Sequence, residues 1–156
     1  MKTTFKTPAF KALFALTFLC LFSFFACKKD PVAPTKEELL TAKKWKISAL
    51  TLTLLSNGTV EDILKGADPC ETDDFQKFET NGTMSEDEGA TKCSPGDPQS
   101  TAGTWAFNTE KTQLTITLDG DKVVTTLVEL SATTLKYTFD EDGAGSDKYT
   151  VTFTAQ

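Results

Sequence analysis

Three segments in the last third of the chain place apolar residues at every second position, with threonines at most of the positions between them. They are QLTITL (113–118), TLKYTF (134–139) and KYTVTFTA (148–155). Because successive side chains of a strand point to opposite faces, this alternation predicts strands with one dry face and one solvated face. Such strands usually pair antiparallel and bury their apolar sides together.

Five further segments bring the number of predicted strands to eight: 45–55, 75–79, 83–88, 103–107 and 122–130. Most connections after residue 100 are short, and Asn-Gly at 81–82 is a strong hairpin signal. We therefore predict an all-β fold, an eight-stranded antiparallel up-and-down barrel, because closure removes the unpaired edges of a sheet.

The segment 45–55 changes its apolar parity. Trp45 and Ile47 share one face of a regular strand, whereas Leu50 and the leucines that follow it share the other. One extra residue near 48–49, a β-bulge, would bring both sets inside the barrel.

A short helix is predicted ahead of the first strand, over residues 36–43. Thr35 and Glu38 have the spacing of a capping box, and Leu39 and Leu40 supply a small apolar face.

The first 26 residues have the features of a secretory signal. Three lysines and no acid precede an apolar run, 12–26, which is shorter than the roughly 20 residues that a spanning helix needs. Ala26 ends the run and Cys27 follows it. This arrangement resembles the lipobox of bacterial lipoproteins, in which signal peptidase II cuts before a cysteine that then carries lipid. An ordinary signal with an incidental cysteine and a single-pass anchor are the alternatives.

The lipobox resemblance implies a division of the chain into a signal peptide (1–26), a tether that begins with a lipidated Cys27 (27–35) and a barrel domain (36–156). Lipid on Cys27 would make a membrane the partner of the protein. We expect it in the cell envelope, lipid-anchored at the outer membrane, on the periplasmic face or at the cell surface. Two prolines in 31–35 predict a stiff, extended tether.

Composition excludes several functions. The sequence contains no histidine and no arginine, which removes Ser-His-Asp and Cys-His catalysis and histidine zinc sites. No pair of carboxylates is singled out by its spacing, so we predict no catalytic residue, no cofactor and no enzyme activity. Without residues 1–26, 13 of the 16 basic residues remain beside 22 acids. The resulting formal charge of −9 opposes binding to nucleic acid.

The predicted compartment determines the expected chemical state of each cysteine. Cys20 leaves with the signal and Cys27 takes lipid, so Cys70 and Cys93 remain in an oxidising environment where disulfides persist. We predict that they pair. The loop of about 24 residues that they would close is worth roughly 3.5 kcal/mol in the chain-entropy model.

Several motifs together resemble one family. They are ELLTAKKWKI (38–47), Cys70 with Asp73, Asp74 and Phe78, Asn81-Gly82-Thr83, Cys93, Gly103-Thr104-Trp105 and TLKYTF (134–139). Their order and spacing are similar to those of the lipocalin-like lipoproteins of Gram-negative bacteria, over residues 36–156. The resemblance implies a calycin-type barrel with its short helix plugging one end. Lys43 stands where transport lipocalins have a glycine before the tryptophan, and their arginine is absent, so the resemblance is to the lipocalin-like group.

Aromatic residues on the predicted inward faces are the candidate ligand site: Trp45, Trp105, Phe107, Tyr137, Phe139, Tyr149 and Phe153, with Phe75 or Phe78 beside them. An eight-stranded barrel either fills with side chains or holds one small ligand. Two functions therefore stay open: binding of a small apolar molecule at the barrel mouth or of an envelope partner through the loops, and a structural or interaction module with a filled barrel.

Two acidic segments, 68–74 and 140–147, raise a third possibility. Calcium takes six to eight oxygen ligands, and a calcium-stabilised carbohydrate-binding module could use such loops. In 140–147, however, Gly143 comes too early for an EF-hand and no glutamate closes the loop. Solvated loops explain both segments, so we assign no metal ligand.

Overall fold

The computed structural model describes residues 32–140 and 145–156. The chain forms two units, residues 1–33 and 34–156. Every helix and strand of the described residues belongs to the second unit, and so does the whole core, so this unit has what a domain needs to fold alone. The predicted signal peptide, 1–26, and Cys27 lie outside the described residues. Within the described part, no helix has the length and apolar character needed to cross a membrane.

Strands make up most of the second unit. In chain order the described elements are α1 (Lys36–Thr41), β1 (Lys44–Thr53), β2 (Val60–Asp62), α2 (Pro69–Thr72), β3 (Phe75–Phe78), β4 (Thr83–Asp87), β5 (Ser100–Phe107), β6 (Gln113–Leu118), β7 (Asp121–Leu130), β8 (Thr134–Asp140) and β9 (Lys148–Ala155).

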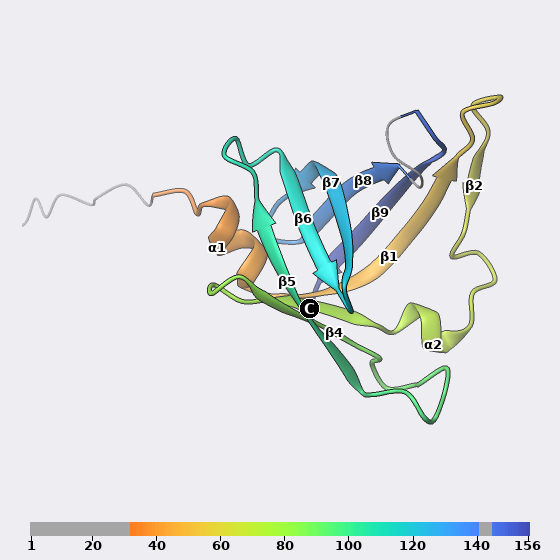
Figure 1. Cartoon of the computed structure of the whole chain (residues 1–156), viewed down its shortest axis with the longest axis horizontal. Helices are drawn as coiled ribbons and strands as arrows, with labels where there is room; N and C mark the ends of the chain where they lie inside the picture. Colours follow the sequence, from red (N-terminus) through yellow and green to blue (C-terminus); the bar gives the residue numbers. More distant parts are fainter. Residues whose placement is uncertain (1–31, 141–144) are drawn as a thin grey trace, which may run out of the picture. The chain divides into compact units, whose positions relative to one another are not determined.

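The strands from β3 to β9 form an antiparallel meander in which each strand pairs with the next. The sequence colouring of Figure 1 shows this order, from green at β4 to dark blue at β9. β9 then pairs with β1, and β1 pairs with β3, so the sheet closes on itself. The prediction of an eight-stranded antiparallel barrel is thus confirmed. Among the described residues, the sheet has one strand more than predicted, β2, which pairs with β1 outside the closed ring of eight.

One edge of β1 is shared by two partners. β3 pairs with β1 over Lys44–Lys46, and β2 pairs with it over Thr51–Thr53. Between these two ladders, the backbone N–H of Ile63 donates to the carbonyl of Leu50 at 2.9 Å. β1 therefore parts from β3 after Lys46 and pairs with β2 from Thr51 onward, so the partner strand of β1 changes between these residues.

The predicted β-bulge in β1 is present. The register between β1 and β9 shifts between Ile47 and Ala49. Trp45 is fully buried before the shift, and Leu50 packs against the core after it. The extra residue thus reconciles the two apolar sets of the strand, as the change of parity predicted.

Helix α1 begins with the predicted capping box. The Thr35 hydroxyl accepts from the N–H of Glu38 at 3.2 Å, and the Glu38 carboxylate accepts from the N–H of Thr35 at 2.7 Å. Leu40 is fully buried, and its carbonyl accepts from the indole N–H of Trp45 at 2.7 Å. This helix therefore closes one end of the barrel, as the family resemblance implied.

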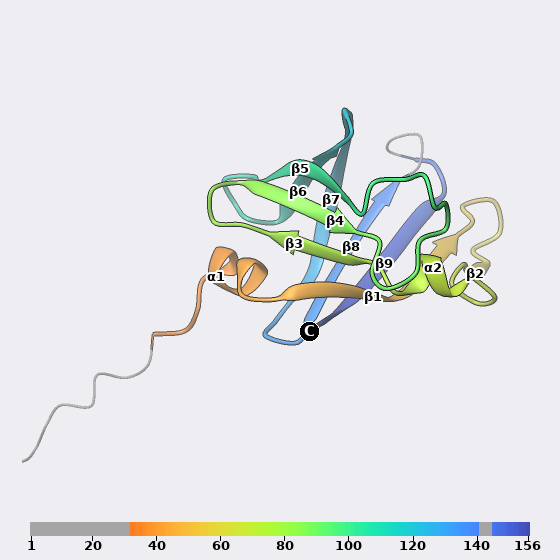
Figure 2. The same cartoon turned by 90° about the horizontal axis from the view of Figure 1, so that it is seen from below.

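The two helices lie at opposite ends of the barrel. In Figures 1 and 2, α1 lies beside one end of β3 and β4, whereas α2 and β2 lie beside the other. The buried core joins both ends through one cluster of apolar side chains: Leu40, Trp45, Phe78, Met84, Trp105, Leu114, Ile116, Leu135, Tyr137, Val151 and Phe153. The α1 end is closed by packing, which leaves the α2 end as the candidate mouth.

Candidate functional site

A cavity of about 210 Å³ lies at the α2 end of the barrel. Its residues come from β1, from α2 and the residue before β3, and from β3, β4, β8 and β9. The apolar part of its wall consists of Ile47, Leu50, Phe75, Phe139, Val151 and Phe153. Ile47 and Leu50 are on the stretch of β1 that lies between its two partner strands. The cavity thus lies where the barrel wall changes partner.

The polar part of the wall consists of Glu71, Asp74, Gln76 and Glu86. Gln76 on β3 and Glu86 on β4 are direct register partners, and the Gln76 amide donates to the Glu86 carboxylate at 3.3 Å. Burial, followed by the charge of Glu86, raises the pKa of the Tyr137 phenol above its usual range. A hydrogen bond with the Gln76 amide partly offsets this rise in pKa. Glu86 is two residues from buried Met84 on β4 and lines the cavity, so its side chain is on the interior face of the strand.

Asp74 has a raised pKa. It rises from 3.8 to about 6, first because burial removes water from the carboxyl group and then because four neighbouring acids repel its charge: Glu88, Glu86, Asp73 and Asp87. One of its oxygens, Oδ1, is buried without a hydrogen-bond partner, and so is Oε1 of Gln76. The wall therefore carries negative charge together with acceptor atoms that lack donors.

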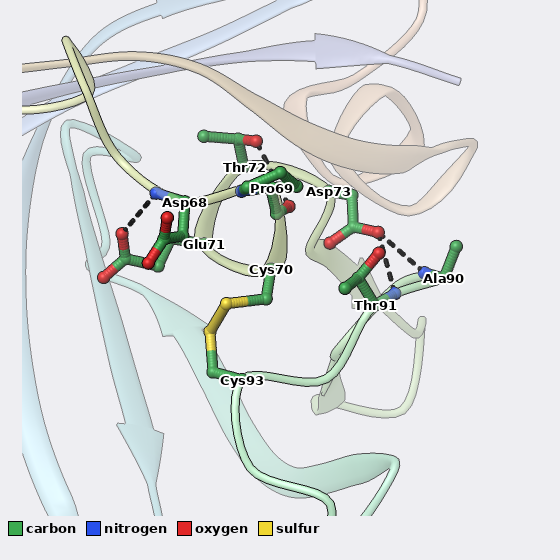
Figure 3. The surroundings of a disulfide bond; sticks show 9 residues. All are labelled: Asp68, Pro69, Cys70, Glu71, Thr72, Asp73, Ala90, Thr91 and Cys93. Atoms are coloured by element: carbon green, nitrogen blue, oxygen red, sulfur yellow. Dashed lines mark hydrogen bonds between the residues drawn. A yellow bond between two sulfur atoms is a disulfide. The ribbon is translucent and has the colours of Figure 1, made fainter.

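A disulfide holds the α2 side of the cavity. Cys70 on α2 is joined to Cys93 in the connection between β4 and β5, as predicted (Figure 3). Beside it, the Asp73 carboxylate accepts from the N–H groups of Ala90 and Thr91, both at 2.9 Å. A Cβ at Gly89 would meet the backbone of Asp73, so only glycine fits this close approach. The disulfide and these contacts fix the segment that carries Glu71 and Asp74.

Two of the seven predicted ligand residues, Phe139 and Phe153, line the cavity. Trp45, Trp105 and Tyr137 are buried in the core, and Phe107 packs against it. Trp105 meets Phe107 edge-on at 5.5 Å, and its indole N–H donates to the Glu79 carbonyl at 3.0 Å. Tyr149 stacks on Phe139 at 5.1 Å and is not among the residues that line the cavity. Most of the predicted aromatic set therefore fills the barrel.

The sequence-based prediction missed Gln76 and Glu86, although a signal for them exists. Phe78 and Met84 are buried and face each other in the register between β3 and β4. Two residues further along each strand, the same face carries Gln76 and Glu86. Polar residues at positions whose parity points to the core are the pattern that could have identified them.

The acidic segments 68–74 and 140–147 are the places where the sequence leaves calcium binding open. In the described part of the chain, no three side chains of His, Cys, Asp or Glu are placed to hold a metal ion. In 68–74, Glu71 caps α2 by accepting from the N–H of Asp68 at 2.9 Å, and Asp73 binds backbone N–H groups. Residues 141–144 of the other segment lie outside the described residues.

The closed barrel and the cavity at its mouth define a class of small β-barrel proteins. Residues 41–137 match the model of the lipocalin-like domain family, and the chain belongs to that family. No curated protein matches its sequence significantly.

Two solved structures align with most of this chain. A DUF4847 family protein from Bacteroides vulgatus superposes with a TM-score of 0.51 at 10% identity, over 78% of this chain and 98% of that one. A lipocalin-like protein from Bacteroides uniformis aligns with a TM-score of 0.46 at 16% identity, over 76% of this chain and 99% of that one. At 10% identity, the likeness to the DUF4847 family protein supports the fold alone.

Proposed function

We propose that this protein is a binding protein of the cell envelope, which holds a small molecule in the cavity at the α2 end of its barrel. The observation that carries the proposal is the cavity itself: six apolar residues and four polar ones line one space of about 210 Å³. Ligand sites in barrels favour the mouth, and they combine apolar walls with a few polar groups.

The size of the cavity limits the ligand. Pockets for drug-sized ligands measure roughly 300–1,000 Å³, so a cavity of about 210 Å³ suits a smaller molecule. The filled α1 end, with Leu40 and Trp45 fully buried, leaves no room for a long chain to pass through the barrel. The ligand therefore enters and leaves at the α2 end.

Native mass spectrometry of the protein purified gently from its own host tests the binding proposal. We expect an added mass, which a Leu50→Trp variant loses because the indole fills the cavity. A matched Val128→Trp variant should retain the added mass, because Val128 is 55% exposed on β7 and lies outside the cavity wall. Circular dichroism of both variants checks that they fold.

The competing function is an interaction module without a small ligand. It is favoured by the small volume of the cavity and by the aromatic residues that fill the rest of the barrel. A bare chain from the host that also binds no small molecule in vitro would support this alternative and overturn the binding proposal.

The envelope part of the proposal rests on the lipobox-like segment that ends at Cys27. Replacing Cys27 by Ser should abolish lipid labelling of the protein and either release it from the membrane or leave its signal peptide uncleaved. A Cys20→Ser variant, altered inside the predicted signal, is the matched control and should be processed normally. A Cys27→Ser protein that still incorporates labelled fatty acid would overturn the anchor.

A further inference from the structure

We infer that the cavity selects ligands with a positively charged amino group and a short apolar body. This inference rests on the proposed binding function and specifies its ligand class. Three features of the cavity carry it: the charge of its polar wall, the acceptor atoms without donors, and the apolar surface opposite them.

The charge of the wall has one sign. Its polar residues are three acids and one amide, and none of its ten residues is a lysine. The ion pairs among the described residues are Lys111–Glu37 and Lys148–Asp140, and neither involves a cavity carboxylate. Lys44 and Lys46 lie about 6 Å from the ring of Phe75, on the β1 positions next to inward-facing Trp45. The carboxylates of the cavity are therefore without a cationic partner from the described chain.

The acceptor atoms need donors. Oδ1 of Asp74 and Oε1 of Gln76 are buried and have no hydrogen-bond partner, while both residues line the cavity. A buried acceptor left unmatched costs free energy that a suitable donor recovers. An ammonium group offers three donors and a positive charge. It can therefore donate to the unpartnered acceptors and also pair with the carboxylates of the wall. A carboxylate or phosphate ligand would supply neither and would be repelled by Glu86.

A metal ion fits this cavity poorly. No three acidic or sulfur ligands within the described ranges are arranged to hold one. The facing wall is apolar, with Leu50, Phe139 and Val151 among its residues. A divalent cation would keep its water against such a wall, whereas the hydrocarbon part of an amine would bury apolar surface there.

The test compares three ligands with one hydrocarbon chain and different head groups: n-hexylamine, 1-hexanol and hexanoate. Their binding to the 34–156 unit is followed by chemical shift changes in NMR at pH 7.5. We expect the amine to bind about tenfold more tightly than the alcohol, the factor that one charge-assisted hydrogen bond supplies. Hexanoate should bind more weakly than both.

Two variants separate the head-group contact from the rest of the cavity. Glu86→Gln should lower the affinity for hexylamine about tenfold and leave that for hexanol unchanged. Glu129→Gln is the matched control, because Glu129 is exposed on β7 and lies outside the cavity wall, and it should change neither affinity. Equal loss for both ligands in a Glu86→Gln protein whose NMR spectrum shows the native fold would overturn the assigned contact.

The acidity of the wall predicts a pH dependence. Asp74 is surrounded by Asp73, Glu86, Asp87 and Glu88, and it shares the cavity wall with Glu71. As the pH falls from 7.5 to 5, it takes up a proton, so the affinity for hexylamine should fall while that for hexanol stays constant. This loss should be smaller in Asp74→Asn.

The outcomes distinguish the inference from the proposed function. Binding of hexanol or hexanoate as tight as that of hexylamine would overturn the amine preference and leave a binding cavity in place. Absence of binding by all three would overturn both proposals. Binding of hexylamine that Leu50→Trp does not reduce would place the amine elsewhere on this acidic protein and would overturn the inference.

Discussion

Removing the Cys70–Cys93 disulfide should cost about 3.5 kcal/mol of unfolding free energy. The bond spans 23 positions, so it closes a loop of about 24 residues, whose closure entropy gives this value in the chain-entropy model. The native position of α2 has other supports, because the Asp73 carboxylate binds two backbone N–H groups of the same loop. A Cys70→Ser/Cys93→Ser variant should therefore fold normally and lose stability mainly through its less constrained unfolded state.

Urea denaturation of the 34–156 unit, followed by tryptophan fluorescence, measures this loss. The double variant should show a lower midpoint and a larger dependence of free energy on urea, because its unfolded chain exposes more surface. Wild-type protein treated with a reducing agent serves as the matched control and should coincide with the variant. A loss below about 1 kcal/mol in both would refute the reasoning, since it would mean that the unfolded loop is already constrained.

Three further predictions concern single residues. Gly103→Ala should cost about 3 kcal/mol in urea denaturation, because the new Cβ would collide with the backbone carbonyl of Thr117. Trp45→Phe should cost about 2 kcal/mol, because it leaves the buried Leu40 carbonyl without its indole donor. Asp74→Asn should raise stability by about 1 kcal/mol at pH 7.5, after allowance for solvent screening, and should have no effect near pH 4.

The sign of the last prediction follows from the raised pKa of Asp74. Folding raises it from 3.8 to about 6, so the neutral carboxyl is favoured in the fold. Its contribution to stability is fully present below pH 3.8 and is lost as the pH rises through 6. Asp121→Asn, at an exposed position of β7, is the control and should show no pH-dependent gain. A gain for Asp74→Asn that is equal at pH 4 and pH 7.5 would contradict this explanation.

The other two predictions have controls in the chain as well. A Cβ at Gly96 has open space around it, so Gly96→Ala should leave stability within about 0.5 kcal/mol of the wild type. A Gly103→Ala variant as stable as Gly96→Ala would mean that β5 and β6 can separate without cost. For Trp45, retention of full stability in the Phe variant would show that water reaches the Leu40 carbonyl.

The barrel could be predicted from the sequence because its signals are local. Alternation with a period of two marked the strands, and Asn81-Gly82 marked the turn between β3 and β4, where Gly82 has a φ of 84°. The capping box at Thr35 and the change of parity near Ser48 each lie within a few residues of the feature that they specify. Features that depend only on residues close in the sequence can be predicted without knowledge of the fold.

Strand β2 and helix α2 were not predicted, because their structure depends on distant partners. Val60–Asp62 is exposed throughout and shows no alternation, so its pairing follows from the free edge that β1 offers beyond β3. Helix α2 has four residues and no buried one, and its support includes Pro69 at its start and the bond to Cys93. Such elements are set by tertiary contacts that no local window contains.

The cavity was only partly predictable. Phe139 and Phe153 were identified from strand parity, and the same rule applied to β3 and β4 would have added Gln76 and Glu86. Glu71 and Asp74 come from a connecting segment that is positioned by contacts distant in the sequence, so their approach to β8 and β9 requires the fold. The sequence indicated that Glu71 and Asp74 were acidic and did not indicate that they face apolar side chains.

The two ends of the barrel are closed by different physical means, and the difference bears on where function lies. At the α1 end, Leu40 and Trp45 are fully buried and share a hydrogen bond, so this end is at a packing minimum. At the α2 end, acids crowd around Asp74, and three buried acceptor atoms, on Asp73, Asp74 and Gln76, lack donors. A neutral apolar wall would be more stable. A covalent bond and the contacts of Asp73 hold this end in place despite the repulsion. A fold that only needed a stable barrel would gain by replacing Asp74, whereas a site that receives a cation requires this charge before the ligand arrives.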